Sequence, residues 1–444
     1  MHRTDVVKVF PQPGLPSLTM RVPGDKSISH RAAILGAMAA GETVLEGYLN
    51  SADCLATLKA LSQLGVKIER QGERVRIASS GVAGWQEPDD ILDLGNSGTG
   101  LRLLAAAVCR VPGVSILTGD ASLRRRPMGR IVRPLQDMGA KISGRRQGEL
   151  APLVVDGNGA SLRGREFKLA VASAQVKTAL LLAGLSADGW TVVEEPALSR
   201  DHTERLFRYL GVEMRQEAGR GRVAVAGGQR LRSFHLRIPG DISSAAFFLS
   251  AYAPVPGAEI VVEKVGVNPT RTGILQVLQR MGARVEVANL VEEGGEPRAD
   301  IRLVGGNLKA TEIGGAEIPL LIDELPVLSV VATQARGVTV IKDAAELRVK
   351  ESDRIEVLAD CLGRLGVKVE KTPDGLIIPG PQRIRSGEVD SRGDHRIAMA
   401  MATAALWAEG PVSIEGAGWV DTSYPGFFST LARVTRVEQE ERRA

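Results

Sequence analysis

Basic side chains recur at the predicted beginnings of helices along this 444-residue chain. The recurring positions are Lys26, Arg126, Arg200, Arg271, Lys350 and Arg396. A helix N-terminus carries the positive end of the helix dipole and unbonded backbone N–H groups, so a cation is unfavourable there unless an anion lies beside it. Arginine also binds carboxylates and phosphates through paired hydrogen bonds. If these helix starts converge on one cleft, the cleft should bind a strongly anionic ligand.

Hydroxyl and carboxylate groups accompany these cations. Ser27, Ser173 and Ser199 stand at the same predicted helix starts, where serine is also an ordinary N-cap that needs no ligand. Asp323 and Glu351 are carboxylates placed among the cations, and they suit either acid–base catalysis or simple ion pairing. The residue types leave these two interpretations open. The chemistry they favour is non-covalent acid–base work on phosphate or carboxylate substrates.

Signatures of other chemistries are missing from the sequence. It contains no GxxxxGK[ST] phosphate loop, no GxGxxG after a strand, no HExxH and no GxSxG. Cys54, Cys109 and Cys361 are too scattered for a disulfide framework or a cysteine zinc site, and we expect them to be buried. The five histidines lack metal-ligand spacing, and His202 and His395 suit structural roles at helix starts. A metal site is therefore not expected.

An internal repeat must position the candidate residues. A phrase typical of a helix end followed by a strand recurs every 71 to 84 residues. Its five clear copies lie at 64–68, 138–142, 210–214, 281–285 and 365–369, with a degenerate sixth near Leu431. The second residue of each clear copy is a glycine, which suits the left-handed position that ends a helix.

A second series of predicted helices alternates with the first. These helices should begin near Asp25, Asn96, Ser173, Asp241, Asp323 and Asp394. Six copies of about 72 residues account for nearly the whole chain. Each copy holds two helices and three or four short strands, which predicts a mixed α/β fold with helices packed inside small sheets. The repeat count predicts a domain of residues 23–240 and a second domain of 241–444 that also takes in residues 1–22.

Composition narrows the class of protein. With 44% hydrophobic and 24% charged residues the chain should be globular, and its longest apolar run, 397–408, is shorter than the roughly 18 residues of a membrane span. The first twenty residues lack the apolar core of a signal peptide, which favours the cytoplasm. The net charge of +4 is spread along the chain and only 4% of residues are aromatic, so neither nucleic acid nor membrane is an expected partner.

Seven segments, in order along the chain, resemble the EPSP synthase family (3-phosphoshikimate 1-carboxyvinyltransferases). They are 23–31 (PGDKSISHR), 94–102 (LGNSGTGLR), 126–128 (RPM), 173–175 (SAQ), 239–244 (PGDISS), 348–354 (RVKESDR) and 394–396 (DHR). The resemblance covers nearly the whole chain. It implies an α/β (α+β) two-domain inverse barrel of six βαβαββ-type units, three per domain, with the active site in the interdomain cleft.

The resemblance also implies the reaction. The enolpyruvyl group of phosphoenolpyruvate would pass to the 5-hydroxyl of shikimate 3-phosphate by addition and elimination, without a metal or organic cofactor. Asp323 would be the base, and Glu351, with Lys26 nearby, would protonate the enol carbon. Shikimate 3-phosphate would be held by Lys26, Ser27, Arg31, Ser173, Ala174, Gln175, Ser199, Arg200, Asp323 and Lys350. Phosphoenolpyruvate would be held by Lys26, Gly98, Arg126, Gln175, Arg354 and Arg396.

Three positions differ from the better-known family pattern. Ala174 replaces a serine, Glu346 replaces an asparagine, and Ser423 stands where a lysine contacts phosphoenolpyruvate. With the segments 173–177 (SAQVK), 200–204 (RDHTE) and 268–271 (NPTR), these differences resemble the glyphosate-tolerant class II enzymes. Gly98, in contrast, is the small residue typical of sensitive enzymes. The family's glyphosate binding and a monomeric state are further expectations.

Two alternatives remain at this point. UDP-N-acetylglucosamine 1-carboxyvinyltransferase shares the fold, but it typically has a cysteine in the loop that here reads TGDASLRRR (118–126), and asparagine where this chain has Ser27. A non-enzymatic binder of RNA or polyphosphate could use the same basic helix starts, and its affinity would fall steeply with salt. The scarcity of aromatic residues argues against the second alternative.

Overall fold

Glycines of the repeated phrase end five helices in the computed structural model, which describes residues 5–217 and 221–441. These helices are α2 (Ala52–Gln63), α4 (Gly129–Asp137), α7 (His202–Tyr209), α9 (Gly273–Met281) and α12 (Arg354–Arg364). The glycines at 65, 139, 211, 282 and 366 have φ between 71° and 118°, a region open mainly to glycine. The predicted helix ends are therefore confirmed.

The second helix series forms the interior. It consists of α1 (Lys26–Met38), α3 (Gly98–Ala107), α6 (Ala174–Leu185), α8 (Ile242–Tyr252), α11 (Leu325–Ala332) and α13 (His395–Ala405), each starting within two residues of the predicted position. Most of their residues are buried on every side, because alanine, glycine and serine let neighbouring helices approach closely. Within one set α3 packs on α1 and α6, and within the other α8, α11 and α13 pack on one another.

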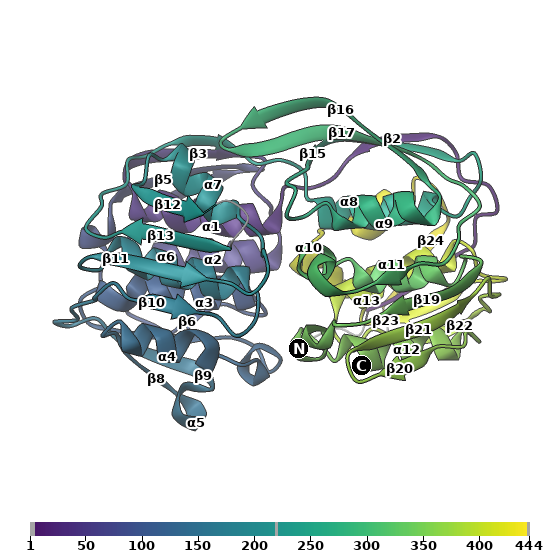
Figure 1. Cartoon of the computed structure of the whole chain (residues 1–444). Coiled ribbons are helices and arrows are strands. Elements are labelled where there is room, and N and C mark those ends of the chain that lie inside the picture. Colours follow the sequence, from purple (N-terminus) through teal and green to yellow (C-terminus); the bar gives the residue numbers. More distant parts are fainter. Residues whose placement is uncertain (1–4, 218–220, 442–444) are drawn as a thin grey trace. The chain divides into compact units, whose positions relative to one another are not determined.

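The chain divides into two units (Figure 1). Unit 1 comprises the chain up to Pro23, Gly240–Val291 and Pro297 to the C-terminus, and unit 2 comprises Gly24–Pro239 and Glu292–Glu296. Each unit has its own hydrophobic core. Three short helices complete the set in the described residues: α5 (Arg145–Gly148), α10 (Ile318–Leu321) and α14 (Phe427–Leu431).

Unit 2 contains three four-stranded sheets. In order across each sheet, the first is β14 (His235–Arg237), β3 (Ala40–Glu46), β5 (Arg74–Ser80) and β4 (Lys67–Gln71). The second is β6 (Leu92–Asp93), β7 (Val114–Thr118), β9 (Leu150–Asp156) and β8 (Lys141–Gly144). The third is β10 (Glu166–Lys168), β11 (Trp190–Glu194), β13 (Arg222–Ala226) and β12 (Met214–Glu217).

Unit 1 contains three sheets of the same size, except that the segment Glu292–Glu296, where β16 ends and β17 begins, belongs to unit 2. The first is β2 (Leu18–Arg21), β15 (Glu259–Gly266), β17 (Glu296–Val304) and β16 (Arg284–Glu293). The second is β18 (Glu312–Ile313), β19 (Gly337–Ile341), β21 (Gly375–Gly380) and β20 (Glu370–Thr372). The third is β22 (Gly387–Asp390), β23 (Val412–Glu415), β1 (Asp5–Val9) and β24 (Val437–Glu441).

All six sheets share one pairing rule. The first two strands are parallel and the next pair is antiparallel, as in β10 with β11 followed by β11 with β13. A parallel pair needs a crossover, and in four of the six sheets the connection between the parallel strands contains a buried helix, α3, α6, α11 or α13. The predicted fold of six α/β units with interior helices is confirmed.

Two strands are exchanged relative to chain order. β2 precedes α1 in the sequence but pairs with β15 in unit 1, and β14, which closes unit 2, pairs with β3 beside α1. The chain thus passes between units at Pro23–Gly24 and again at Pro239–Gly240. Over the described part of the chain, no helix combines the length and hydropathy that a bilayer crossing requires.

Candidate active site

The start of α1 carries a lysine that is paired with a carboxylate. Lys26 is the first residue of the helix, and Asp25 caps it by accepting the backbone N–H of Ile28 at 2.9 Å. The Lys26 Nζ lies 3.0 Å from Oδ2 of Asp53, which is in the first turn of α2. The Lys26 side chain remains 15% exposed, so its ammonium can reach a ligand. Sequence reasoning missed Asp53, because one carboxylate in a first helical turn is common.

The start of α3 brings two guanidinium groups together over a glycine. A Cβ placed on Gly98 would lie 3.1 Å from Nη1 of Arg102 and 3.1 Å from Nη1 of Arg126. Arg126 is held in place by Asn96, to whose Oδ1 its Nη2 donates at 2.6 Å. Gly98 therefore leaves the space that these two cations occupy at the N-terminus of the helix.

The start of α6 joins the start of α3. Arg102 Nη1 donates to Gln175 Oε1 at 2.5 Å, and Gln175 Nε2 donates to Thr99 Oγ1 at 2.9 Å. Ser173 caps α6 by accepting the backbone N–H of Val176 at 3.4 Å, and the helix begins at the next residue, Ala174. Arg102, to which sequence reasoning assigned no ligand, thus helps to connect the two helices.

Arg31 ties three helices together. Its Nε, Nη1 and Nη2 donate to Thr203 Oγ1, the Ser27 carbonyl and Thr178 Oγ1 at 2.9, 2.9 and 3.0 Å. Burial lowers the pKa of Arg31 to about 10, and the positive charge of Arg200 contributes. Arg200 itself donates to Ser27 Oγ at 3.4 Å. All three Arg31 nitrogens thus already contact oxygens of α1, α6 and α7.

Unit 2 therefore carries its share of the predicted ligand residues on helix starts or just before them. They are Lys26, Ser27, Arg31, Gly98, Arg126, Ser173, Ala174, Gln175, Ser199 and Arg200. The hydrogen bonds of Arg31 connect α1 with α6 and α7, and those of Gln175 connect α3 with α6. The set is rich in cations, as an anion site requires.

In unit 1 a single guanidinium gathers three carboxylates. Arg354, the first residue of α12, lies 2.8 Å from Asp394 through Nε, 3.3 Å from Asp323 through Nη1 and 2.5 Å from Glu351 through Nη2. Burial alone would lower the pKa of Arg354, but the charges of Asp394, Glu351 and Asp323 raise it well above its usual value. Asp323 and Glu351, the two predicted catalytic carboxylates, thus share one permanently charged partner.

Arg396 is a second guanidinium group in contact with Asp323. Its Nη1 donates to the Asp323 carbonyl at 3.1 Å, and its Nη2 is 3.7 Å from Asp323 Oδ2. Its Nη1 is also 3.9 Å from Oε1 of Glu324, a buried carboxylate that accepts the Ser243 hydroxyl. Arg271 donates to the same hydroxyl at 2.8 Å. Sequence reasoning assigned no role to Glu324, whose neighbour Asp323 carried the stronger signal.

The remaining predicted positions lie in or directly after short helical turns. Glu346 lies in the turn Ala345–Val349, and Lys350 comes directly after it and before Glu351. Ser423 is buried at the end of the turn Ala417–Thr422. All three belong to unit 1, as Asp323 and Arg354 do.

The thiols are unsuited to nucleophilic chemistry. All three cysteines are free and buried, as expected from their spacing. Burial raises the pKa of Cys109 and Cys361 to about 12 and that of Cys54 higher still, so the thiols stay protonated at neutral pH. In the described ranges, no group of three or more His, Cys, Asp or Glu side chains is arranged to hold a metal ion.

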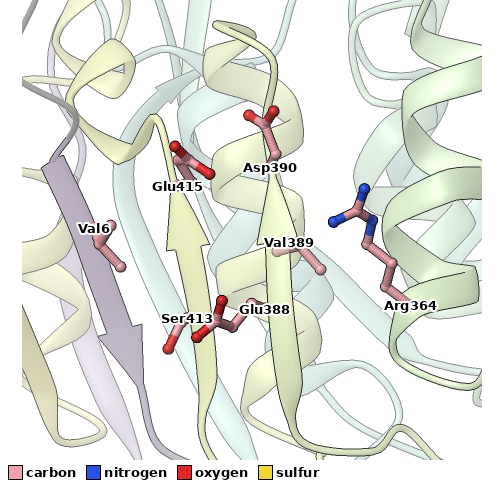
Figure 2. Close-up of a pocket in the computed structure, with 7 residues that line it drawn as sticks. All are labelled: Val6, Arg364, Glu388, Val389, Asp390, Ser413 and Glu415. Carbon is pink, nitrogen blue, oxygen red and sulfur yellow. The ribbon is translucent and has the colours of Figure 1, made fainter.

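Two surface hollows lie away from the candidate residues. One, of about 60 Å³, is lined by Glu388, Asp390 and Glu415 on β22 and β23, with Arg364 as its basic residue (Figure 2). The other, of about 210 Å³, lies on the third sheet of unit 2 and is lined by Trp190, Val192, Arg215, Glu217, Arg222 and Ala224. The acidic lining of the first repels anions, and neither hollow contains a predicted site residue.

Comparison with known proteins identifies one family. Residues 17–431 match the family described as EPSP synthase (3-phosphoshikimate 1-carboxyvinyltransferase). A 3-phosphoshikimate 1-carboxyvinyltransferase of Bacillus cereus (strain 03BB102) is 49% identical over 415 residues, which are 94% of this chain and 96% of that protein. The protein of the same name from Pelotomaculum thermopropionicum is 51% identical over 418 residues, again 94% of this chain and 96% of that one.

Solved structures agree with the sequence matches. EPSP synthase from Acinetobacter baumannii is 42% identical, with a TM-score of 0.87 over 98% of this chain and 100% of that chain. The enolpyruvyl transferase NikO from Streptomyces tendae has a TM-score of 0.80 over the full length of both chains at 18% identity. The second likeness supports the fold alone.

Proposed function

The chain belongs to the EPSP synthase family, and we propose that the two groups of side chains described above act on the same pair of substrates. The enzyme transfers the enolpyruvyl group of phosphoenolpyruvate to the 5-hydroxyl of shikimate 3-phosphate and releases phosphate. Each substrate carries a phosphate and a carboxylate. The cationic helix starts of unit 2 and the guanidinium groups of unit 1 supply charges of the opposite sign.

Shikimate 3-phosphate is assigned mainly to unit 2. Its proposed ligands are Lys26, Ser27, Arg31, Ser173, Ala174, Gln175, Ser199 and Arg200, with Asp323 and Lys350 of unit 1. The supporting observation is that Arg200 meets Ser27 and that Arg31 bridges α1, α6 and α7, so these residues form one connected surface. The departure at Ala174 removes a hydroxyl from that surface.

Phosphoenolpyruvate is assigned to Lys26, Gly98, Arg126, Gln175, Arg354 and Arg396. Gly98 supports this, because the missing side chain leaves room for two guanidinium groups beside the first turn of α3. Arg354 supports it in a different way. Its Nη2 is engaged by Glu351, so a substrate carboxylate would bind there by replacing Glu351.

The observation that carries the mechanism is the sharing of Arg354 by Asp323 and Glu351. In the addition step the 5-oxygen bonds to C2 of phosphoenolpyruvate, Asp323 takes the hydroxyl proton, and Glu351, with Lys26 nearby, gives a proton to C3. In the elimination step the bond from C2 to the phosphate oxygen breaks, C3 returns its proton to Glu351, and the departing phosphate takes up the proton held by Asp323. A carboxyl group displaced from its cation takes up a proton more readily, which suits Glu351 to the acid role once substrate holds Arg354.

Three finer assignments belong to the same proposal. The class II, glyphosate-tolerant type is supported by the segments around Lys177, His202 and Arg271, and the enzyme is proposed to act as a cytoplasmic monomer. Complete competition of low micromolar glyphosate with phosphoenolpyruvate would refute the tolerant type. Sedimentation at catalytic concentrations measures the oligomeric state.

Phosphate release tests the reaction and its site. Purified enzyme is incubated with phosphoenolpyruvate alone, with shikimate 3-phosphate, or with UDP-N-acetylglucosamine in its place. We expect release only with shikimate 3-phosphate, and its loss in Lys26→Ala but not in Lys59→Ala, which changes an exposed lysine of α2. Release only with the sugar nucleotide would assign the related transferase activity, and Lys26→Ala with full activity would remove Lys26 from the site.

A further inference from the structure

A buried cation on α6 is shared by two carboxylates that the mechanism does not use. Lys177 Nζ lies 2.7 Å from Glu195 and 2.7 Å from Glu204, and the three side chains are at most 4% exposed. Burial pushes the pKa of Lys177 down, but the charges of Glu204 and Glu195 outweigh it and raise the pKa. Burying such a group is costly for stability. Its position one helical turn after Ser173 suggests a functional reason.

Glu195 divides its two oxygens between different tasks. Its Oε2 faces Lys177 at 2.7 Å. Its Oε1 accepts the backbone N–H of Ser173 at 3.1 Å and the hydroxyl of Ser199 at 2.5 Å. One carboxylate thus fixes both the N-cap of α6 and the loop that leads to Arg200, the two segments assigned to shikimate 3-phosphate.

This geometry gives the hydroxyls of Ser173 and Ser199 different roles. Ser199 has a single hydroxyl proton, and a carboxylate such as Glu195 can only accept a hydrogen bond. The Ser199 hydroxyl therefore donates its one hydrogen bond to Glu195. The hydroxyl of Ser173 accepts a backbone N–H from Val176, which leaves its proton available for a ligand. Ser199, named above among the proposed ligands, is thereby limited to orienting the loop, whereas Ser173 and Arg200 are placed to touch the ligand.

Lys177 explains how a carboxylate is tolerated beside a phosphate site. An unpaired Glu195 would repel the phosphate, and the Lys177 ammonium, which Glu195 shares with Glu204, offsets part of that charge. Glu204, on α7, binds the same ammonium and so connects α6 with α7. The adjacent residues Thr178 and Thr203 meet at 2.6 Å and reinforce the connection.

We propose that Glu195 is a positioning residue of the shikimate 3-phosphate site, which holds the Ser173 amide and the Ser199–Arg200 loop in their binding geometry while Lys177 offsets part of its charge. The proposal rests on the proposed function of that site. It adds a residue that makes no contact with the substrate itself.

Glu195→Gln is the sharpest test, because glutamine has one acceptor oxygen where glutamate has two. If that oxygen faces the serines, the amide N–H₂ points at the Lys177 ammonium; if it faces Lys177, the N–H₂ points at the Ser173 N–H. Either orientation puts donor against donor. Lys177 keeps Glu204 as a partner with balanced charge, so the variant should fold. Glu194→Gln, at the half-buried neighbouring residue whose side chain is 36% exposed, is the matched control.

Titration calorimetry with shikimate 3-phosphate gives the primary readout, and steady-state kinetics gives the second. We expect Glu195→Gln to raise the Kd for shikimate 3-phosphate about tenfold, as loss of one hydrogen bond to a charged group implies. The KM for phosphoenolpyruvate should stay within about twofold, a split that general loss of structure would not produce. Glu195→Asp keeps the charge but shortens the reach, and it should show the same split if Glu195→Gln does not fold.

The outcomes separate the inference from its premise. Wild-type affinity in a folded Glu195→Gln or Glu195→Asp protein would overturn the positioning role and leave the proposed site intact. An equal rise in Kd for Glu194→Gln would overturn it too. Failure of the wild-type protein to bind shikimate 3-phosphate would instead overturn the proposed function and this inference with it.

Discussion

Replacement of Lys177 by methionine should produce a loss of stability with a characteristic dependence on pH. In the native protein one ammonium lies 2.7 Å from each of two buried carboxylates. The raised pKa of Lys177 means that its contribution is fully present below its usual value of 10.5 and is lost only as pH rises through the higher native value. Between pH 5 and 8 the Lys177 ammonium therefore stays charged.

The magnitude follows from what Lys177→Met leaves behind. Methionine fills much of the same volume, so the main cost is two buried carboxylates without their cation, about 3 to 5 kcal/mol near neutral pH. The native variant relieves this by holding a proton on Glu195 or Glu204 at pH values where the unfolded chain has released it. Stability then falls as pH rises, by about 1.4 kcal/mol per pH unit for one proton.

Urea unfolding at several pH values tests this reasoning, with tryptophan fluorescence as the signal. We expect the deficit of Lys177→Met relative to wild type to shrink by about 2 to 3 kcal/mol between about pH 7.5 and 5.5. Lys141→Met is the matched control, since Lys141 is 55% exposed and lies 3.9 Å from Asp156, and it should cost less than about 1 kcal/mol at either pH. A deficit that does not change with pH would refute the electrostatic account and indicate lost packing alone.

Three further predictions concern single positions. Burial, together with the charges of Lys26 and Arg31, lowers the pKa of His30 well below 6.5. Below pH 6.5 the unfolded chain therefore binds a proton that the native protein does not, and the free energy of unfolding should fall by up to about 1.4 kcal/mol per pH unit. Urea unfolding of His30→Gln should show a smaller slope. Gly98→Ala places a Cβ 3.1 Å from two guanidinium groups at a position with ordinary φ. Phosphate-release kinetics should show a severalfold higher KM for phosphoenolpyruvate, while the free energy of unfolding changes by less than about 1 kcal/mol. Asp323→Asn should lower kcat at least about 100-fold with little change in thermal unfolding, and a kcat within tenfold of wild type would remove Asp323 as the base.

Helix starts and ends were predictable because they depend on local chemistry. Asp25 and Asp241 cap α1 and α8 with their own side chains, and Gly65 or Gly282 ends a helix because the left-handed conformation favours glycine. Those features repeat along the chain at a nearly constant interval. The six-unit architecture could therefore be counted before any contact was known.

The pairing of the carboxylates was not predictable in the same way. Asp53, Glu195 and Glu324 resemble many other acidic residues in the sequence, and no spacing marks their partners. Asp53 meets Lys26 across 27 residues, and Glu195 meets Ser173 across 22 residues, in each case from a different part of the fold. Which side chains meet depends on how the helices pack, and that depends on the whole core.

The sequence by itself determined the repeat, the helix boundaries and the cationic character of the helix starts, because capping, glycine conformation and charge are properties of neighbouring residues. The tertiary structure alone decided which strand joins which sheet, so that β2 pairs with β15 while β14 pairs with β3. It also decided that Arg354 gathers Asp323 and Glu351. The physical reason is that a buried charge takes its partners from whatever the packed core brings within hydrogen-bond distance.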